Sequence, residues 1–163
     1  MGKICIFTGH RALPDSAAPL EQALDLRLEA LAEAGYTDFL SGGAVGFDLL
    51  AAEAVLRAKE RFPALRLIMI LPYEGQDRFY SASDRRRYQT LLERADLVRY
   101  TARDYYKGCL LARDRVLAEA ADGCICYLTR STGGTAYTVR QALLRDVPVW
   151  NLADGLSAVD SPL

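Results

Sequence analysis

Short apolar runs alternate with longer amphipathic runs along almost the whole chain. Residues 3–7 (K-I-C-I-F) and 65–71 (L-R-L-I-M-I-L) have the continuous apolar character of buried parallel strands. Between Pro19 and Gly35, leucines at positions 20, 24, 28 and 31 recur at helical spacing. This alternation predicts an α/β fold. We expect a single Rossmann-like domain, with a mostly parallel sheet of about six strands and helices on both faces.

The rest of the chain continues the same pattern. Further strands are predicted at 37–40, 96–100, 123–128 and 147–150. Further helices are predicted at 44–61, 84–94, 107–120 and 135–144, with Ser83 as the N-cap of the second of these. A chain of 163 residues suffices for one domain. We therefore expect one domain over 1–163, with a core over about 3–150 and a short tail over 151–163.

Charge and hydropathy limit the classes of partner. The net charge of −1 argues against a dedicated nucleic-acid binder, and the run Arg85–Arg87 is expected to be a solvated helix face. No apolar run approaches the about 20 residues that span a bilayer, and the N-terminus shows no signal-peptide pattern. We therefore expect a cytoplasmic protein without a membrane partner.

The cysteines and the single histidine indicate no metal site. Cys5, Cys124 and Cys126 lie in apolar strand-like runs, and Cys109 is the fourth cysteine. Cys124 and Cys126 would share one face of a strand, but no second pair and no histidine partner accompanies them. We expect buried, reduced thiols and no metal.

Two glycine-rich segments each follow an apolar run and open a helical run. They are 41–48 (S-G-G-A-V-G-F-D) and 131–135 (S-T-G-G-T). Glycine allows a positive φ and lets a ligand approach the backbone, and a helix N-terminus attracts anions. The first segment matches neither a dinucleotide fingerprint nor a P-loop. Together they make a nucleotide, or another phosphate-bearing small molecule, the leading ligand hypothesis.

Two more strand ends carry polar residues, at 8–11 (T-G-H-R) and 72–75 (P-Y-E-G). Parallel α/β sheets bind ligands beyond the carboxyl ends of their strands, near the switch in strand order. We therefore expect the four segments at one edge of the sheet, with 8–11 between the two glycine-rich segments.

Individual side chains suggest roles within such a pocket. Arg11 suits a bidentate phosphate contact. Asp48 would repel phosphate, so it would accept from ribose hydroxyls or a base, or complement the N-terminus of its helix. His10, Asp48 and Glu53 are the candidates for acid–base catalysis, with a backbone tie as the alternative for His10. Arg113 and Asp114 either reach the pocket or form a surface salt bridge.

Several motifs in combination resemble the SLOG superfamily, and its YpsA-like group in particular. They are T-G-H-R at 8–11, S-G-G-A-V-G-F-D-L-L-A-A-E at 41–53, R-D-R at 113–115 and C-Y-L-T-R-S-T-G-G-T-A-Y-T-V at 126–139. The resemblance covers residues 3–150. It implies a Rossmann-like fold, a nucleotide-related ligand at the glycine loops and a homodimer. The superfamily includes the DNA-processing protein DprA and the LOG phosphoribohydrolases, which release the base from a nucleoside monophosphate.

The chain departs from the family patterns in two places. LOG enzymes carry a catalytic glutamate in the motif P-G-G-x-G-T-x-x-E, but here Gly134 and Thr135 are followed by A-Y-T-V. The missing glutamate puts LOG-type hydrolysis in doubt. YpsA-like relatives usually have asparagine where this chain has Asp114, which adds negative charge near the expected pocket.

We therefore expect a binding module, or ligand sensor, for a nucleotide or a nucleotide derivative of ADP-ribose or NAD type, with no required cofactor. The alternatives are a hydrolase of nucleotides or N-glycosidic bonds and a DprA-like DNA-associated module. The residues expected to contact the ligand are Thr8, Gly9, His10, Arg11, Ser41, Gly42, Gly43, Gly46, Asp48, Pro72, Glu74, Arg113, Asp114, Gly133, Gly134 and Thr135.

Overall fold

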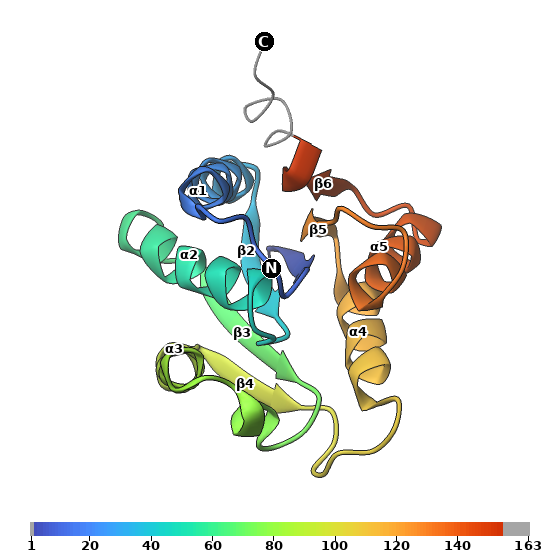
Figure 1. Cartoon of the computed structure of the whole chain (residues 1–163). Coiled ribbons are helices and arrows are strands. Elements are labelled where there is room, and N and C mark those ends of the chain that lie inside the picture. Colours follow the sequence, from blue (N-terminus) through green and yellow to red (C-terminus); the bar gives the residue numbers. More distant parts are fainter. Residues whose placement is uncertain (1, 155–163) are drawn as a thin grey trace.

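A six-stranded parallel sheet lies between two layers of helices in the computed structural model, which describes residues 2–154 (Figure 1). The strands are β1 (Lys3–Gly9), β2 (Tyr36–Ser41), β3 (Arg66–Leu71), β4 (Leu97–Tyr100), β5 (Gly123–Tyr127) and β6 (Val149–Asn151). The helices are α1 (Ala18–Glu33), α2 (Phe47–Arg61), α3 (Ala82–Arg94), α4 (Cys109–Ala120), α5 (Gly134–Leu144) and the 3₁₀ turn η1 (Gln76–Phe79).

The strand order is β4-β3-β2-β1-β5-β6. The chain moves outward from β1 to β4, then crosses back to place β5 on the other side of β1. Right-handed crossovers therefore put α1, α2 and α3 on one face and α4 and α5 on the other, as Figure 1 shows. The predicted α/β Rossmann-like architecture is confirmed, and the switch in strand order lies between β1 and β5.

Alternate residues of the central strand supply two separate cores. Cys5 and Phe7 pack under α1 and α2, in the cluster that contains Leu20, Leu24 and Leu28 of α1. Ile6 packs on the opposite face with residues of α4 and α5. β1 is therefore covered on both faces, which explains the continuous apolar run in its sequence.

Two local expectations need correction. The N-cap of α3 is Ser81 and not Ser83, because the Ser81 hydroxyl accepts the backbone N–H of Asp84 at 3.1 Å and Ser83 lies inside the first turn. α2 begins at Phe47 rather than at 44, because Gly46 has φ +84° and interrupts the helical backbone. The predicted tail over 151–163 begins one residue too early, because Asn151 is the last residue of β6. Residues 155–163 of this tail lie outside the described residues.

The four cysteines are free and buried.

None of the helices formed by residues 2–154 has the length and apolar character required to cross a membrane.

The Phe7 ring is fully buried against the rings of Phe39 and Phe47, with centroid distances of 6.1 and 6.4 Å. We expect Phe7→Ala to lower the free energy of unfolding by about 3–5 kcal/mol, because it removes a large core side chain and leaves a cavity. Phe79→Ala, the same change at a side chain that is 86% exposed, should stay within about 0.5 kcal/mol of wild type. Guanidinium unfolding midpoints measure both, and equal losses would contradict this account of the core.

Candidate nucleotide-binding cleft

A cleft of about 530 Å³ opens at the carboxyl ends of β1 and β5, where the strand order switches. Four segments line it: the loop after β1, the start of α2 with the loop before it, the first half of α4, and the loop between β5 and α5. The lining residues are Thr8, Gly9, His10, Arg11, Ala12, Ala44, Asp48, Leu110, Leu111, Arg113, Asp114, Arg130, Thr132, Gly133, Gly134 and Thr135. This is the position at which parallel α/β sheets bind ligands.

The N-terminus of α5 is open to the cleft. No side chain of the described residues caps it, and its N-cap is Gly133, which has φ +99°. A Cβ added to Gly133 would meet no described atom within 4 Å, and one added to Gly134 would meet only Asp114 Oδ2, at 3.5 Å. The unpaired N–H groups of this helix end therefore face space that a ligand can fill.

The glycines of the 41–48 segment face protein instead. A Cβ on Gly46 would lie 2.3 Å from the backbone oxygen of Arg11, and one on Gly42 would lie 2.6 Å from the Arg113 guanidinium. Gly43 is enclosed by Leu71, Tyr88 and Gln76. These glycines allow protein segments to pack closely against one another, and none of the three lines the cleft.

The same packing logic applies to two other predicted residues. A Cβ on Gly9 would lie 2.4 Å from the Phe47 side chain, although the Gly9 backbone lines the cleft. Ser41 is fully buried, and its hydroxyl accepts from Gly43 N and donates to the Asp48 carbonyl. Ser41 therefore fixes the shape of the segment that carries Asp48.

Arg113 is buried and held on two sides. Its Nε donates to Asp114 Oδ1 at 2.8 Å, and its Nη1 donates to the carbonyl oxygen of Gly42 at 2.6 Å. The guanidinium thus joins α4 to the β2–α2 loop under the cleft. Burial raises the pKa of Asp114, although Arg113 and the Thr138 hydroxyl lower it. The surface salt bridge considered for Arg113 and Asp114 is therefore wrong, because their side chains are only 6% and 13% exposed.

Asp48 presents an unsatisfied carboxyl group at the cleft wall. Its Oδ2 accepts the backbone N–H of Ala44 at 3.3 Å, whereas the buried Oδ1 has no partner among the described residues. Burial, and secondarily the charge of Asp114, raise the pKa of this carboxyl, which comes to about 7 in balance with the groups that lower it. The charges of Arg113 and Arg11 and the N–H of Ala44 lower it, without offsetting burial.

His10 ties two loops together. Its Nε2 accepts the backbone N–H of Thr129 at 2.8 Å, so this nitrogen carries no proton. Its backbone carbonyl accepts from Phe47 N, and its ring packs edge-on against Tyr127. Burial, and secondarily the Arg130 guanidinium, lower the pKa of His10. A neutral imidazole therefore holds the loop after β1 against the start of the β5–α5 loop.

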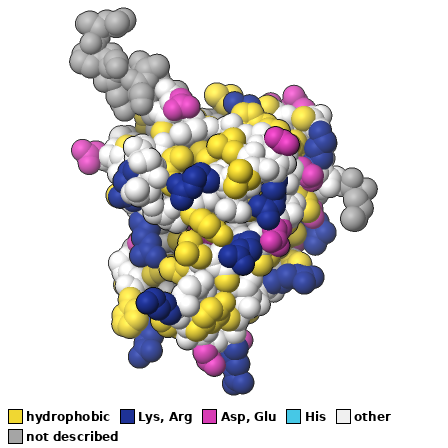
Figure 2. Space-filling model, turned by 90° about the vertical axis from the view of Figure 1, so that its right-hand side faces the viewer, with side chains coloured by type: hydrophobic (Ala, Val, Ile, Leu, Met, Phe, Trp, Pro, Cys, Tyr) yellow, Lys and Arg dark blue, Asp and Glu magenta, His cyan; other side chains and the backbone are white. Residues whose placement is uncertain are grey.

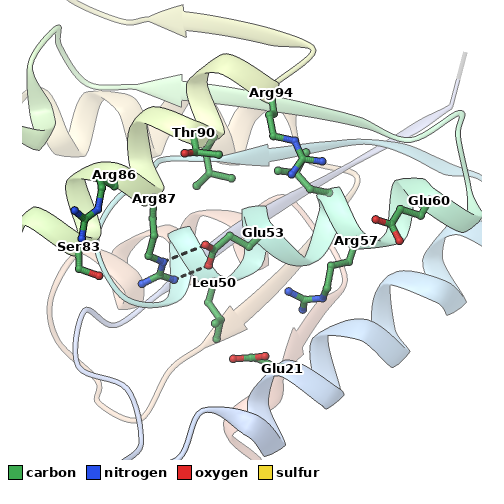
Figure 3. Close-up of a pocket in the computed structure, with 12 residues that line it drawn as sticks. Glu21, Leu50, Glu53, Arg57, Glu60, Ser83, Arg86, Arg87, Thr90 and Arg94 are labelled. Carbon is green, nitrogen blue, oxygen red and sulfur yellow. Dashed lines mark hydrogen bonds and ion pairs between the residues drawn. The ribbon is translucent and has the colours of Figure 1, made fainter.

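Glu53 lies away from the cleft. It belongs to a second cavity of about 520 Å³ between α1, α2 and α3, where both of its carboxylate oxygens bind Arg87, at 2.6 and 3.1 Å (Figure 3). Pro72 and Glu74 also lie outside the cleft lining; Pro72 is buried, and Glu74 N donates to the carbonyl of Arg103. The structure therefore separates these three residues from the other candidates.

The sequence pointed to no individual role for Arg130 or Thr132, which line the cleft. It also pointed to none for Gln76 and Tyr80, which hold the β2–α2 loop in place. Gln76 Nε2 and Tyr80 Oη donate to the carbonyl oxygens of Gly42 and Gly43, at 3.2 and 2.9 Å. Arg130 could have been found from the sequence, because it is a cation in a loop that follows a predicted strand. Gln76 and Tyr80 act across 34 and 37 positions of sequence, which no local pattern reveals.

No group of three or more His, Cys, Asp or Glu side chains in residues 2–154 is arranged to hold a metal ion. The cleft instead combines an open helix N-terminus and arginines with the two carboxyl groups of Asp48 and Asp114. Such an arrangement can bind an anion at one end and hydrogen-bond donors at the other.

The model of the YspA SLOG family (YpsA) matches residues 3–146. The chain belongs to this family. A UPF0398 protein of Halalkalibacterium halodurans, BH1768, is 29% identical over 129 residues, which cover 77% of this chain and 68% of that protein. A UPF0398 protein of Oceanobacillus iheyensis, OB1025, is 25% identical and covers 92% of this chain and 88% of the relative.

Solved structures with a similar fold include two DNA processing proteins A. The protein from Helicobacter pylori, solved to describe its single-stranded DNA binding mode, has a TM-score of 0.65 and 22% identity, covering 96% of this chain and 73% of that chain. The protein from Streptococcus pneumoniae has a TM-score of 0.65 and 19% identity, covering 99% of this chain and 58% of that one. These likenesses show a shared fold.

The raised pKa of Asp48 predicts a loss of stability at alkaline pH. The folded-state pKa of about 7 exceeds the ordinary 3.8, so folding favours the acid form, and stability falls as pH rises from about 4 through 7. We expect Asp48→Asn to remove this loss and to stabilise the protein at pH 9 by up to about 4 kcal/mol, with little effect at pH 4. Urea unfolding across pH measures it. Asp15→Asn removes a carboxyl group at an exposed position and should leave the dependence of the unfolding free energy on pH as in the wild type. The same wild-type dependence in Asp48→Asn would refute the assignment.

Proposed function

We propose that the protein binds a nucleotide or a nucleotide derivative of ADP-ribose or NAD type in this cleft, and that it serves as a sensor of that ligand. The observation that carries the proposal is Gly134. The fold does not require a glycine there, because an added Cβ would make only one ordinary contact and no left-handed φ is involved. The missing side chain instead leaves room in front of the α5 N-terminus.

The phosphate end of the ligand is proposed to lie at α5. The N–H groups of residues 134 and 135 and the hydroxyl of Thr135 are available there, since Gly133, Gly134 and Thr135 line the cleft. Arg11 and Arg130 line the same cleft and add two guanidinium groups suited to phosphate oxygens. Anions gain from both the helix dipole and these cations.

The sugar end is proposed to lie at Asp48. Asp48 lines the cleft, and within the described residues its side chain accepts only the N–H of Ala44, so the carboxyl group has capacity to accept from a ligand hydroxyl group. Thr8 also lines the cleft and carries a hydroxyl group, and Ala12, Ala44 and Leu110 supply apolar contact area. A phosphate and a polyhydroxylated sugar in one molecule match these two ends.

Gly134→Ala tests the proposal without a folding defect. Alanine favours helix by up to about 1 kcal/mol over glycine in a helix interior, so the melting temperature should stay equal or rise. The added methyl group should occlude the phosphate position and weaken binding by about 10-fold or more. Isothermal titration calorimetry with AMP, ADP-ribose, NAD and ribose 5-phosphate measures the affinities.

Two results would overturn this assignment. One is the absence of binding of every compound in the panel to the wild-type protein at millimolar concentration. The other is unchanged affinity in Gly134→Ala. Glu33→Ala serves as a control, because Glu33 is exposed at the end of α1, outside the cleft lining, and its replacement should leave affinity unaltered.

Contact with single-stranded DNA is the second candidate, favoured by aromatic side chains exposed beside cations. Tyr105 and Tyr106 are 65% and 49% exposed; Lys107 follows them directly, and Arg103 precedes them with Asp104 in between. Exposed rings can stack on bases, and cations can contact phosphates. Oligo(dT) binding should then weaken steeply with salt and with Tyr105→Ala. Weak binding that is insensitive to salt, measured by fluorescence anisotropy, would remove this candidate.

A homodimer is also proposed, with support from the face that α4 and α5 form. Leu111, Val116, Leu143 and Leu144 are exposed there. Figure 2 shows apolar side chains on this face, with Lys and Arg side chains among them. Light scattering of the purified protein determines the oligomeric state.

A further inference from the structure

The arginine run at 85–87 is only partly solvated. Arg85 donates to two backbone carbonyl oxygens of η1, and Arg87 binds both carboxylate oxygens of Glu53. Arg86 is exposed and has no hydrogen-bond or ion-pair partner within residues 2–154. The predicted solvated helix face is therefore confined to one of the three side chains, and that side chain lines the second cavity.

This second cavity, of about 520 Å³, is a groove whose floor is α2 and whose walls are α1 and α3 (Figure 3). In Figure 1 the three helices lie on one face of the sheet, with α2 in the middle. The bonds between Arg87 of α3 and Glu53 of α2 join the two helices at the groove. The groove shares no lining residue with the cleft at β1 and β5, so it is a separate candidate site.

The α3 wall carries two cations without partners. Arg86 and Arg94 line the groove and are exposed, and neither has a polar partner among the described residues. Thr90 lies midway between them in sequence, so all three side chains share one face of the helix. This wall therefore offers two guanidinium groups and a hydroxyl group to an acidic ligand.

The free charges on the other side of the groove are negative. On the α1 wall, Asp25 forms an ion pair with Arg57 of α2. One turn earlier on each helix, Glu21 meets another carboxylate, Glu53, in place of a cation, and it has no ion-pair partner in the described part of the chain. Glu60, near the end of α2, also lines the groove without such a partner. The unpaired charges are thus positive on α3 and negative on α1 and α2 (Figure 3).

The floor of the groove offers little apolar surface. Leu50, Leu56 and Leu91 line it, but each is at most 8% exposed. A partner that relied on apolar side chains would gain little here, because little apolar area remains to be removed from water. The groove therefore favours a ligand that is recognised by its charges.

We propose that this groove binds an extended segment of a partner protein in which acidic and basic side chains alternate. Successive side chains of an extended chain point to opposite sides. Acidic side chains at alternate positions would face Arg86 and Arg94 on α3, and the basic side chains between them would face Glu21 and Glu60. The proposal does not depend on ligand binding in the cleft at β1 and β5.

The spacing of the two arginines matches such a segment. Arg94 follows Arg86 by eight residues, which is about 12 Å along the axis of α3. Side chains at positions i and i+4 of an extended chain lie about 13 Å apart, and position i+2 then falls opposite Thr90. An extended segment of about five residues can therefore contact both arginines at once.

The experiment measures binding of fluorescent peptides to the full chain by anisotropy at low ionic strength. The probe alternates glutamate and lysine (E-K-E-K-E-K-E), and a second peptide has the same composition in blocks (E-E-E-E-K-K-K). We expect the alternating probe to bind at least about 5-fold more tightly than the blocked peptide, because only the alternating order matches both sides of the groove. Added salt should weaken this binding, because the contacts are between exposed charges.

The double variant Arg86→Glu/Arg94→Glu reverses the free charges of the α3 wall. Affinity for the alternating probe should fall about 10-fold or more, because like charges then oppose each other. Thermal melting verifies that the variant is folded, as expected for substitutions at exposed positions. The double variant Arg99→Glu/Arg103→Glu makes the same change in net charge at exposed arginines outside the groove, and its affinity should stay within about 2-fold of wild type.

Each contrary result is decisive. No binding of the alternating probe at millimolar concentration and low ionic strength, equal affinity for the two peptides, or unchanged affinity in Arg86→Glu/Arg94→Glu would overturn the proposal. Binding of inorganic polyphosphate but of neither peptide would indicate a simple anion site and would also overturn it. Affinity of the other cleft for AMP or ADP-ribose is measured on the same variants and should not change, so this proposal and the proposed function can fail independently.

Discussion

The hydrogen bonds of the buried Arg113 guanidinium are the contacts on which the arrangement of the cleft depends. The guanidinium bonds Asp114 on its own helix and the carbonyl oxygen of Gly42 on the β2–α2 loop. A buried charge of this kind is costly unless all its partners are present. The contact therefore specifies one arrangement of α4 against the loop that carries Asp48. It also explains why residue 42 has no side chain, because a Cβ would collide with the guanidinium.

The fold class could be predicted because the signals are local. Apolar runs of strand length, leucines at helical spacing in α1 and glycine after its end give the order of elements without any long-range information. Helix starts were harder to place. Ser81 and Ser83 are equivalent as sequence, and only the backbone geometry decides which of them caps α3.

The site could be predicted only in outline. The sequence indicated four strand-end segments, and three of them line one cleft. It could not reveal what approaches each glycine: the backbone of Arg11 at Gly46, a guanidinium at Gly42, and no described atom at Gly133. Nor could it show that Glu53 is bound by Arg87, or that His10 accepts from Thr129, because those partners lie 34 and 119 positions away. Glycine marks a close approach, and only the three-dimensional structure identifies the approaching group.

The contact between Gly46 and the loop after β1 makes the two sides of the cleft mechanically unequal. His10 O accepts from Phe47 N, and the backbone of Arg11 lies against Gly46, so the loop after β1 and the start of α2 brace each other. Around Gly133 the space is unfilled by any described atom. The β2 side of the cleft would therefore keep the same shape for every ligand and would select which ligands bind. The β5–α5 loop would be the part that adapts to differences in ligand size.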